Sequence, residues 1–208
     1  IRSGIGPGAQ LDALGIEQVR DVAGVGANLS DHPALAVVCR VKDPSIIDAD
    51  QPLIQTILRY TADGSDKRND LQIEQLSFAG VAGGPPSFMI AAVLEYQYGR
   101  GELRLRTADP HDQPVIDNQF CDDDRDTQRL IQCFKDTVAF TQQKPLADLI
   151  QLVTFPDLKR RIDDAFIANL CRRRASSGYH PCGTVKMGPA ADPMSVVDQH
   201  GCCHAVDA

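Results

Sequence analysis

The order of the secondary-structure patterns along this chain constrains its fold most, because strand-like segments come first and helical patterns follow. Residues 34–41 (ALAVVCRV), 71–78 (LQIEQLSF) and 87–98 (SFMIAAVLEYQY) are rich in β-branched and apolar side chains, a composition typical of strands. In residues 99–110, Leu103 and Leu105 alternate with charged neighbours, which is the period of a half-buried strand. Because no helical pattern separates the last two segments, they are expected to pair as antiparallel neighbours.

Two helical patterns follow the strands. Leu130, Phe134 and Val138 recur every fourth residue behind the acidic run 122–124, and carboxylates stabilise a helix N-terminus. This helix is expected to end at Pro145, and a second is predicted from about Asp157 to Arg174. Strands followed by helices, without βαβ alternation, predict an α+β fold in which an antiparallel β-sheet is covered by helices on one side.

Two shorter helices are also predicted. One lies near Ala9 to Leu14, among glycine-rich turns. The other is predicted at 53–60 (LIQTILRY), because the preceding Pro52 favours the first turn of a helix. It is expected to end at a polar loop at 62–70. The sequence contains no GxGxxG after a strand. It therefore predicts no dinucleotide-binding fold within this chain.

Charge and cysteine content exclude some classes of partner. A formal net charge of -7 argues against a nucleic-acid partner or an anionic membrane surface, because both attract clustered Lys and Arg. No apolar run approaches the roughly 20 residues that cross a bilayer. The seven cysteines form no repeated CxxC pair, which favours reduced thiols and a cytoplasmic location. The chain begins with Ile1 rather than Met, so we expect further sequence upstream.

Three stretches, in this order along the chain, resemble the glucose–methanol–choline (GMC) oxidoreductase family. They are SGIGP (3–7) with VGANLSDHP (25–33), GRGELRLRTADPHDQPVID (99–117), and YHPCGTVKMGPAADPMSVVD (179–198). The resemblance implies the C-terminal, substrate-binding portion of such an enzyme. It divides the chain into a flavin-domain connection at 1–33, a substrate-binding domain at 34–178, and a catalytic loop with a return toward the flavin domain at 179–208.

The same resemblance implies a function. Family members bind FAD and oxidise an alcohol to a carbonyl, with the flavin as hydride acceptor, and His180 falls on their catalytic histidine. An imidazole with an ordinary pKa of about 6.5 is suited to take the hydroxyl proton. Asn28, Asp207 and Ala208 are the implied flavin contacts. FAD would require a flavin-binding chain or N-terminal domain outside this sequence, so the isolated chain is expected neither to retain FAD nor to oxidise the small-molecule alcohol.

Other interpretations remain open at this point. His180 could be a structural histidine, or the chain could be a flavin-free ligand-binding module or a cofactor-independent acid/base enzyme that keeps only the substrate pocket. His32 is expected to be structural and His111 to lie in an exposed turn. Metal-ligand residue types gather near the end of the chain, at His180, Cys182, His200, Cys202, Cys203 and His204. Their spacing lacks the separated pairs of a zinc site, so no metal is predicted.

Overall fold

The computed structural model of the chain describes residues 1–48, 50–79 and 84–204. The chain forms two compact units. The first combines Ile1–Asp31, Gly99–Gln119 and the chain from Tyr179 onward, and the second combines His32–Tyr98 with Phe120–Gly178. Residues 99–119 thus cluster with the two ends of the chain. The functional division into 1–33, 34–178 and 179–208 stays a prediction.

The second unit contains a six-stranded sheet with strand order β10-β3-β6-β5-β4, in which β9 also pairs with β3. Every pairing in this sheet is antiparallel. The strands are β3 (Pro33–Val41), β4 (Ile54–Tyr60), β5 (Leu71–Ala79), β6 (Ser87–Leu94), β9 (Ile150–Phe155) and β10 (Ser176–Ser177). The strand segments predicted at 34–41 and 71–78 are therefore confirmed as β3 and β5, and the one predicted at 87–98 is confirmed up to Leu94, where β6 ends.

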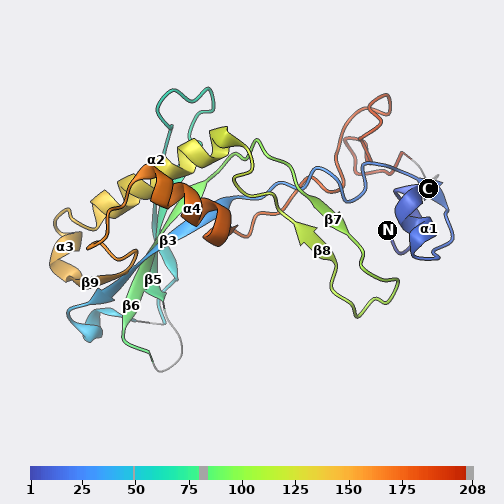
Figure 1. Cartoon of the computed structure of the whole chain (residues 1–208). Helices are drawn as coiled ribbons and strands as arrows, with labels where there is room; N and C mark the ends of the chain where they lie inside the picture. The colour runs from blue at the N-terminus through green and yellow to red at the C-terminus, as the bar shows by residue number, and fades with distance from the viewer. Residues whose placement is uncertain (49, 80–83, 205–208) are drawn as a thin grey trace. The chain divides into compact units, whose positions relative to one another are not determined.

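Helices α2 (Asp124–Phe140) and α4 (Asp164–Arg174) lie against the same face of this sheet (Figure 1). Alternate residues of the central strands, such as Val37, Ile73 and Ala92, point toward the helices and pack with Phe134 of α2 and Ile167 of α4. All five are at most 5% exposed. The α+β fold with helices on one side of an antiparallel sheet is confirmed. The short α3 (Leu146–Leu149) and a 3-10 turn (Pro44–Ile46) complete the unit.

Side-chain caps determine where both long helices begin. Asp123 accepts a hydrogen bond from the Arg125 amide and Asp163 accepts one from the Phe166 amide, which satisfies donors that a helix N-terminus leaves open. The prediction that the second helix starts near Asp157 was wrong, because Asp157 accepts the Lys159 amide in a separate turn. The first helix ends at Phe140 rather than at Pro145, which precedes α3 instead.

The predicted helix at 53–60 was also wrong, because this segment is the edge strand β4. It pairs with β5 from Ile54↔Leu76 to Tyr60↔Leu71. The β-branched residues Ile54, Thr56 and Ile57 suit a strand, and backbone pairing with a neighbour outweighs the weak helix-start signal of Pro52.

The expected pairing of residues 87–98 with 99–110 was wrong as well. β7 (Glu102–Arg104) pairs with β8 (Val115–Asp117), as a two-stranded sheet of the first unit. The Leu103 amide donates to the Gly26 carbonyl at 2.7 Å, so a partner distant in sequence holds this strand. The first unit also contains α1 (Gly8–Ala13), as predicted, between the parallel β1 (Ile5–Gly6) and β2 (Arg20–Asp21).

None of the helices within the described residues combines the length and the apolar character that crossing a membrane requires.

Candidate functional site

The segment that carries His180 is the outer member of a backbone ladder in the first unit. Residues 26–31 lie between residues 101–103 on one side and 180–184 on the other. Leu29 exchanges two backbone hydrogen bonds with Gly101, and Ser30 exchanges two with Cys182, at 2.8–2.9 Å. The Gly26 amide donates to the Thr184 carbonyl at 2.8 Å. Three stretches far apart in the sequence are thereby fixed to one another.

Asp31 anchors the first residue of the outer segment. The His180 amide donates to Oδ1 of Asp31 at 2.9 Å, and Asp31 is only 3% exposed, whereas His180 is exposed. Sequence reasoning missed Asp31 and singled out its neighbour His32. The available signal was an acidic residue shortly after the glycine-rich segment that ends at Asn28, since Asp commonly accepts backbone amides near turns.

Asn28 and Gly183 hold the two segments at close approach. Gly183 has φ +92°, and a Cβ there would lie 2.2 Å from the carbonyl oxygen of Asn28. Asn28 itself has φ 61°, and its Nδ2 donates to the Gly183 carbonyl at 3.3 Å. The structure therefore brings Asn28 together with the His180 segment. The predicted flavin contacts Asp207 and Ala208 lie outside the described residues.

Replacing Gly183 with Ala is expected to loosen this ladder. The new Cβ would collide with backbone, and the left-handed conformation costs an L-residue about 1–2 kcal/mol. We expect amide hydrogen exchange at Ser30 and Cys182 to accelerate about tenfold or more, measured by exchange mass spectrometry. Gly201→Ala is the matched control, since Gly201 also has a positive φ of +81° but no atom within 4 Å of its would-be Cβ. Equal acceleration in both variants would refute the steric argument.

The polar groups near the end of the described chain form hydrogen bonds with one another in tight turns. Asp198 accepts the amides of His200 and Cys202 at 2.8 and 2.9 Å. The ring Nε2 of His204 lies 2.9 Å from the Gly188 carbonyl. Over the residues that the structure describes, no three or more His, Cys, Asp or Glu side chains are grouped in a way that could hold a metal ion.

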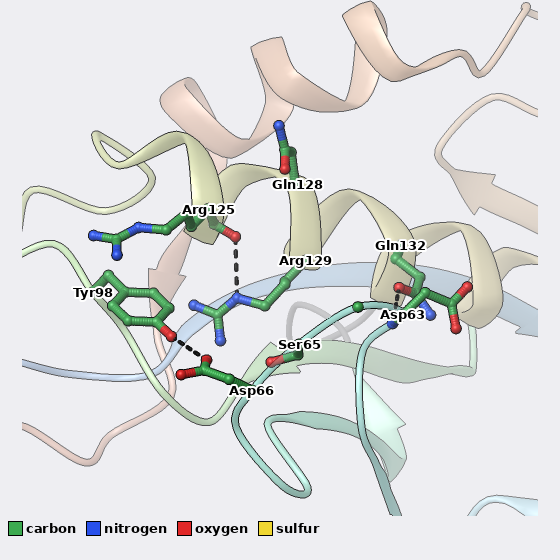
Figure 2. A pocket seen from close by; sticks show the side chains of 9 residues that line it. Asp63, Ser65, Asp66, Tyr98, Arg125, Gln128, Arg129 and Gln132 are labelled. Carbon is green, nitrogen blue, oxygen red and sulfur yellow. Dashed lines mark hydrogen bonds between the residues drawn. The ribbon is translucent and has the colours of Figure 1, made fainter.

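The second unit has a polar pocket of about 260 Å³ between the 63–66 loop and the first turns of α2 (Figure 2). Arg129 lies at its base, pairing with Asp70 at 2.9 Å and with Asp126 at 2.6 Å. Its Nη2 also donates to the Tyr96 carbonyl at 2.8 Å. Burial alone would raise the pKa of Asp70, but hydrogen bonds from Ser65 and the Ala62 amide, together with the Arg129 guanidinium, lower it below its usual value.

The rim of this pocket is more exposed. The Arg125 guanidinium stacks 3.9 Å from the Tyr98 ring centre and pairs with Asp123. The Tyr98 hydroxyl donates to Asp66 at 2.6 Å (Figure 2). These charges are paired with one another. The side chains around the pocket therefore form an ion-pair network that connects the 61–70 loop to α2. Sequence reasoning missed this network, which joins positions about sixty residues apart.

The sheet face opposite the helices carries polar side chains beside a small apolar cluster. Gln72 and Glu74 alternate with the core residues of β5. The side-chain amide of Gln72 donates to the Glu74 carboxylate at 2.9 Å. Glu95 pairs with Arg59 at 2.7 Å and lies 3.6 Å from Nδ1 of His32. His32 thus contacts a carboxylate of its own unit, and its structural role stays a prediction.

Comparison with known proteins relates the chain to one group of enzymes. The family profile described as GMC oxidoreductase matches residues 97–208. Choline oxidase of Arthrobacter globiformis is 30% identical over 94% of this chain and 37% of its own length. The oxygen-dependent choline dehydrogenase of Rhizobium rhizogenes is 31% identical over 94% of this chain and 40% of its own length.

Solved structures share the fold. Pyridoxine 4-oxidase from "Mesorbium loti" superposes with a TM-score of 0.85 at 22% identity, covering 99% of this chain and 41% of that one. A formate oxidase superposes with a TM-score of 0.81 at 20% identity, covering 98% of this chain and 45% of that one. The chain spans about two-fifths of the length of the relatives it matches.

The antiparallel sheet with helices on one face is the fold that the chain shares with these solved structures. The family profile identifies the family itself, because it matches residues 97–208, more than half of the chain. The chain belongs to the GMC oxidoreductase family.

Proposed function

We propose that the protein containing this chain is an FAD-dependent oxidoreductase that oxidises an alcohol CH–OH group to a carbonyl, and that His180 is the base that accepts the hydroxyl proton. The observation that carries the proposal is the presentation of His180. Its backbone is held by the buried Asp31, while the residue itself is exposed. A general base needs this combination of fixed position and access to substrate.

In the proposed reaction, the role of this chain is to accept the hydroxyl proton of the substrate. An alcohol is too weak an acid to ionise at neutral pH, and an imidazole can take its proton as the C–H bond breaks. The bond from the His180 amide to Asp31 and the bonds between Cys182 and Ser30 restrict where the ring can reach. Such positioning lowers the barrier because less freedom is lost in the transition state.

FAD, when bound, supplies the two-electron acceptor for this reaction. We propose that the ladder of the first unit would contact one edge of such a group. Gly26 and Gly183 bring backbone segments within the distance that a Cβ would fill, since their would-be Cβ atoms lie 2.3 and 2.2 Å from neighbouring carbonyl oxygens. We assign Asn28 to this edge, where it would hold the His180 segment beside the cofactor. Asp207 and Ala208 stay proposed contacts, and the remaining flavin contacts are proposed to come from sequence outside this chain.

The substrate is proposed to be a small-molecule alcohol. The relatives are named choline oxidase and oxygen-dependent choline dehydrogenase, and choline is one member of this class. The net charge of -7 gives no electrostatic reason for a nucleic-acid or membrane partner. All seven cysteines are free in the structure, which supports the proposed cytoplasmic location.

The absorbance spectrum of the protein from its complete native reading frame tests the proposal. We expect a bound flavin chromophore that is bleached without oxygen when a small alcohol such as choline is added, because the cofactor takes the electrons. The chain of residues 1–208 purified alone is the control and is expected to be colourless. A colourless complete protein, or alcohol turnover by the isolated chain, would favour a flavin-free binding module or a cofactor-independent acid/base enzyme instead.

A further inference from the structure

Strand β4 forms an open edge of the six-stranded sheet. Among the described strands it pairs only with β5, and every residue from Ile54 to Arg59 is exposed. An edge strand presents unpaired N–H and C=O groups, and proteins commonly protect such an edge with lysine, proline or a covering segment. β4 contains neither Lys nor Pro. Its one charged residue, Arg59, is paired with Glu95, so the strand lacks the usual protection.

Hydrogen bonds at the ends of β6 show which residues of β5 bond to β4. The Glu95 amide donates to the Asp70 carbonyl at 2.8 Å, and the Val41 amide donates to the Pro86 carbonyl at 3.3 Å. Even-numbered residues of β6 therefore bond to β3 and odd-numbered ones bond to β5, because successive residues of an antiparallel ladder alternate in direction. In the same way, even-numbered residues of β5 bond to β6 and odd-numbered ones bond to β4.

The register of β4 against β5 then identifies the backbone groups that face outward. Thr56, Leu58 and Tyr60 are each paired with an odd-numbered residue of β5, so their amides and carbonyls are directed toward that strand. The residues between them, Ile57 and Arg59, have theirs on the other side, where no strand follows among the described residues. The main-chain donors and acceptors of Ile57 and Arg59 are therefore available to a further strand.

An exposed apolar surface lies beside this edge. Leu58 of β4 and Phe140 at the end of α2 are each 42% exposed. Together with Leu146 they line a groove of about 200 Å³, which the buried Ile73 and Ile90 also line. Apolar side chains of this size gain free energy when they leave water. Open backbone groups and open apolar side chains thus occur together along one side of the second unit.

We infer that β4 is the contact surface for a second copy of this chain, whose own β4 pairs with it in antiparallel fashion about a twofold axis at Leu58. In this register Ile57 of each copy exchanges main-chain hydrogen bonds with Arg59 of the other. Leu58 lies opposite its symmetry mate, and the axis keeps the helices of both copies on the same side of a continuous sheet. Leu58 and Phe140 of both copies then cover one another. The inference is independent of the proposed alcohol oxidation.

The pattern of β4 favours its own copy as the partner. A twofold contact requires a surface that matches itself, and Ile57 and Arg59 offer the same donor and acceptor at the two-residue spacing of an antiparallel ladder. No like charges meet, because Arg59 faces Ile57 and keeps its pairing with Glu95. The register also avoids the irregularity between Ile54 and Thr56. Because the matched stretch is short, we expect a weak, reversible dimer.

Sedimentation velocity over a series of concentrations tests the inference on the intact chain. We expect a reversible monomer–dimer equilibrium that Leu58→Lys weakens about 30-fold or more, because two ammonium groups would meet at the axis in place of the apolar contact. Leu152→Lys is the matched control and should associate like the wild type. Leu152 is also a strand residue, 49% exposed in β9, but it lies outside the proposed contact. Circular dichroism checks that both variants fold.

Amide hydrogen exchange measured by NMR on the wild-type chain decides the matter even where a variant fails to fold. Exchange at Ile57 and Arg59 should slow about tenfold or more as the dimer forms, whereas exchange at Gly64, in the exposed loop after β4, should not change with concentration. The inference is overturned if the chain stays monomeric up to about 1 mM, or if Leu58→Lys associates like the wild type. It is also overturned if the Ile57 and Arg59 amides are protected in a monomeric complete protein, because another segment would then cover β4.

Discussion

Replacing Arg129 with Met is expected to lower the free energy of unfolding of this chain by about 3–5 kcal/mol. Methionine keeps the aliphatic stem of Arg129 but removes the partner of Asp70 and Asp126, which are 1% and 0% exposed. A buried carboxylate without its counter-ion keeps the cost of leaving water and loses the attraction that offset it. Urea unfolding, followed by far-ultraviolet circular dichroism, measures the change.

Arg125→Met is the matched control, one helical turn earlier in α2. Its partner Asp123 is also a carboxylate, but the side chains are 63% and 25% exposed. Exposed ion pairs contribute about 0–1 kcal/mol, and the stacking of Arg125 on Tyr98 contributes about 0.5–1 kcal/mol at an exposed site. Equal losses in the two variants would contradict the argument that burial determines the effect.

The pH dependence provides a second readout for Arg129. The pKa of Asp70 is lowered in the folded chain, so its stabilising contribution is present above the unfolded pKa of about 3.9 and is lost as the pH falls through the folded value. In Arg129→Met the same carboxyl lacks its guanidinium, which raises its folded pKa. The stability difference between wild type and variant should therefore shrink as the pH falls from 7 toward 4, and a constant difference would exclude this mechanism.

The main architecture could be predicted because it depends on local periodicity. The alternation in β5 and the four-residue repeat in α2 arise because each element buries one face. Such a pattern can be recognised from residues that are close together in the sequence. β4 could not be assigned in this way. Its side chains are mostly exposed, so no alternation marks it, and its strand conformation depends on pairing with β5. The position of β7 likewise depends on backbone bonds to Gly26.

The same contrast between local patterns and long-range contacts applies to the candidate site. His180 and Asn28 were predicted as site residues from motifs, which record residue types at fixed spacing. Asp31 was missed because its bond to the His180 amide spans 149 positions, and the Arg129–Asp70 pair spans 59. Neither contact leaves a local pattern. Motifs therefore indicated which side chain could carry chemistry, while the structure was needed to show which residues hold it in place.

Replacing His180 with Gln in the complete flavin-containing protein is expected to lower the rate of alcohol oxidation by about 100- to 10,000-fold, the range that a positioned general base contributes. The bond to Asp31 comes from the main-chain amide, so the substitution leaves the ladder and the bound flavin in place. Steady-state kinetics should show the loss in kcat, with the flavin absorbance per polypeptide unchanged. In His180→Ala, added imidazole should restore part of the activity, because a small base can occupy the space that the missing ring leaves. His111→Gln is the control, since His111 is exposed in the 109–112 turn and is given no role in the chemistry. A His180→Gln enzyme with unchanged kcat would show that this histidine is structural, and a loss of flavin would show that it acts on cofactor retention rather than on the proton.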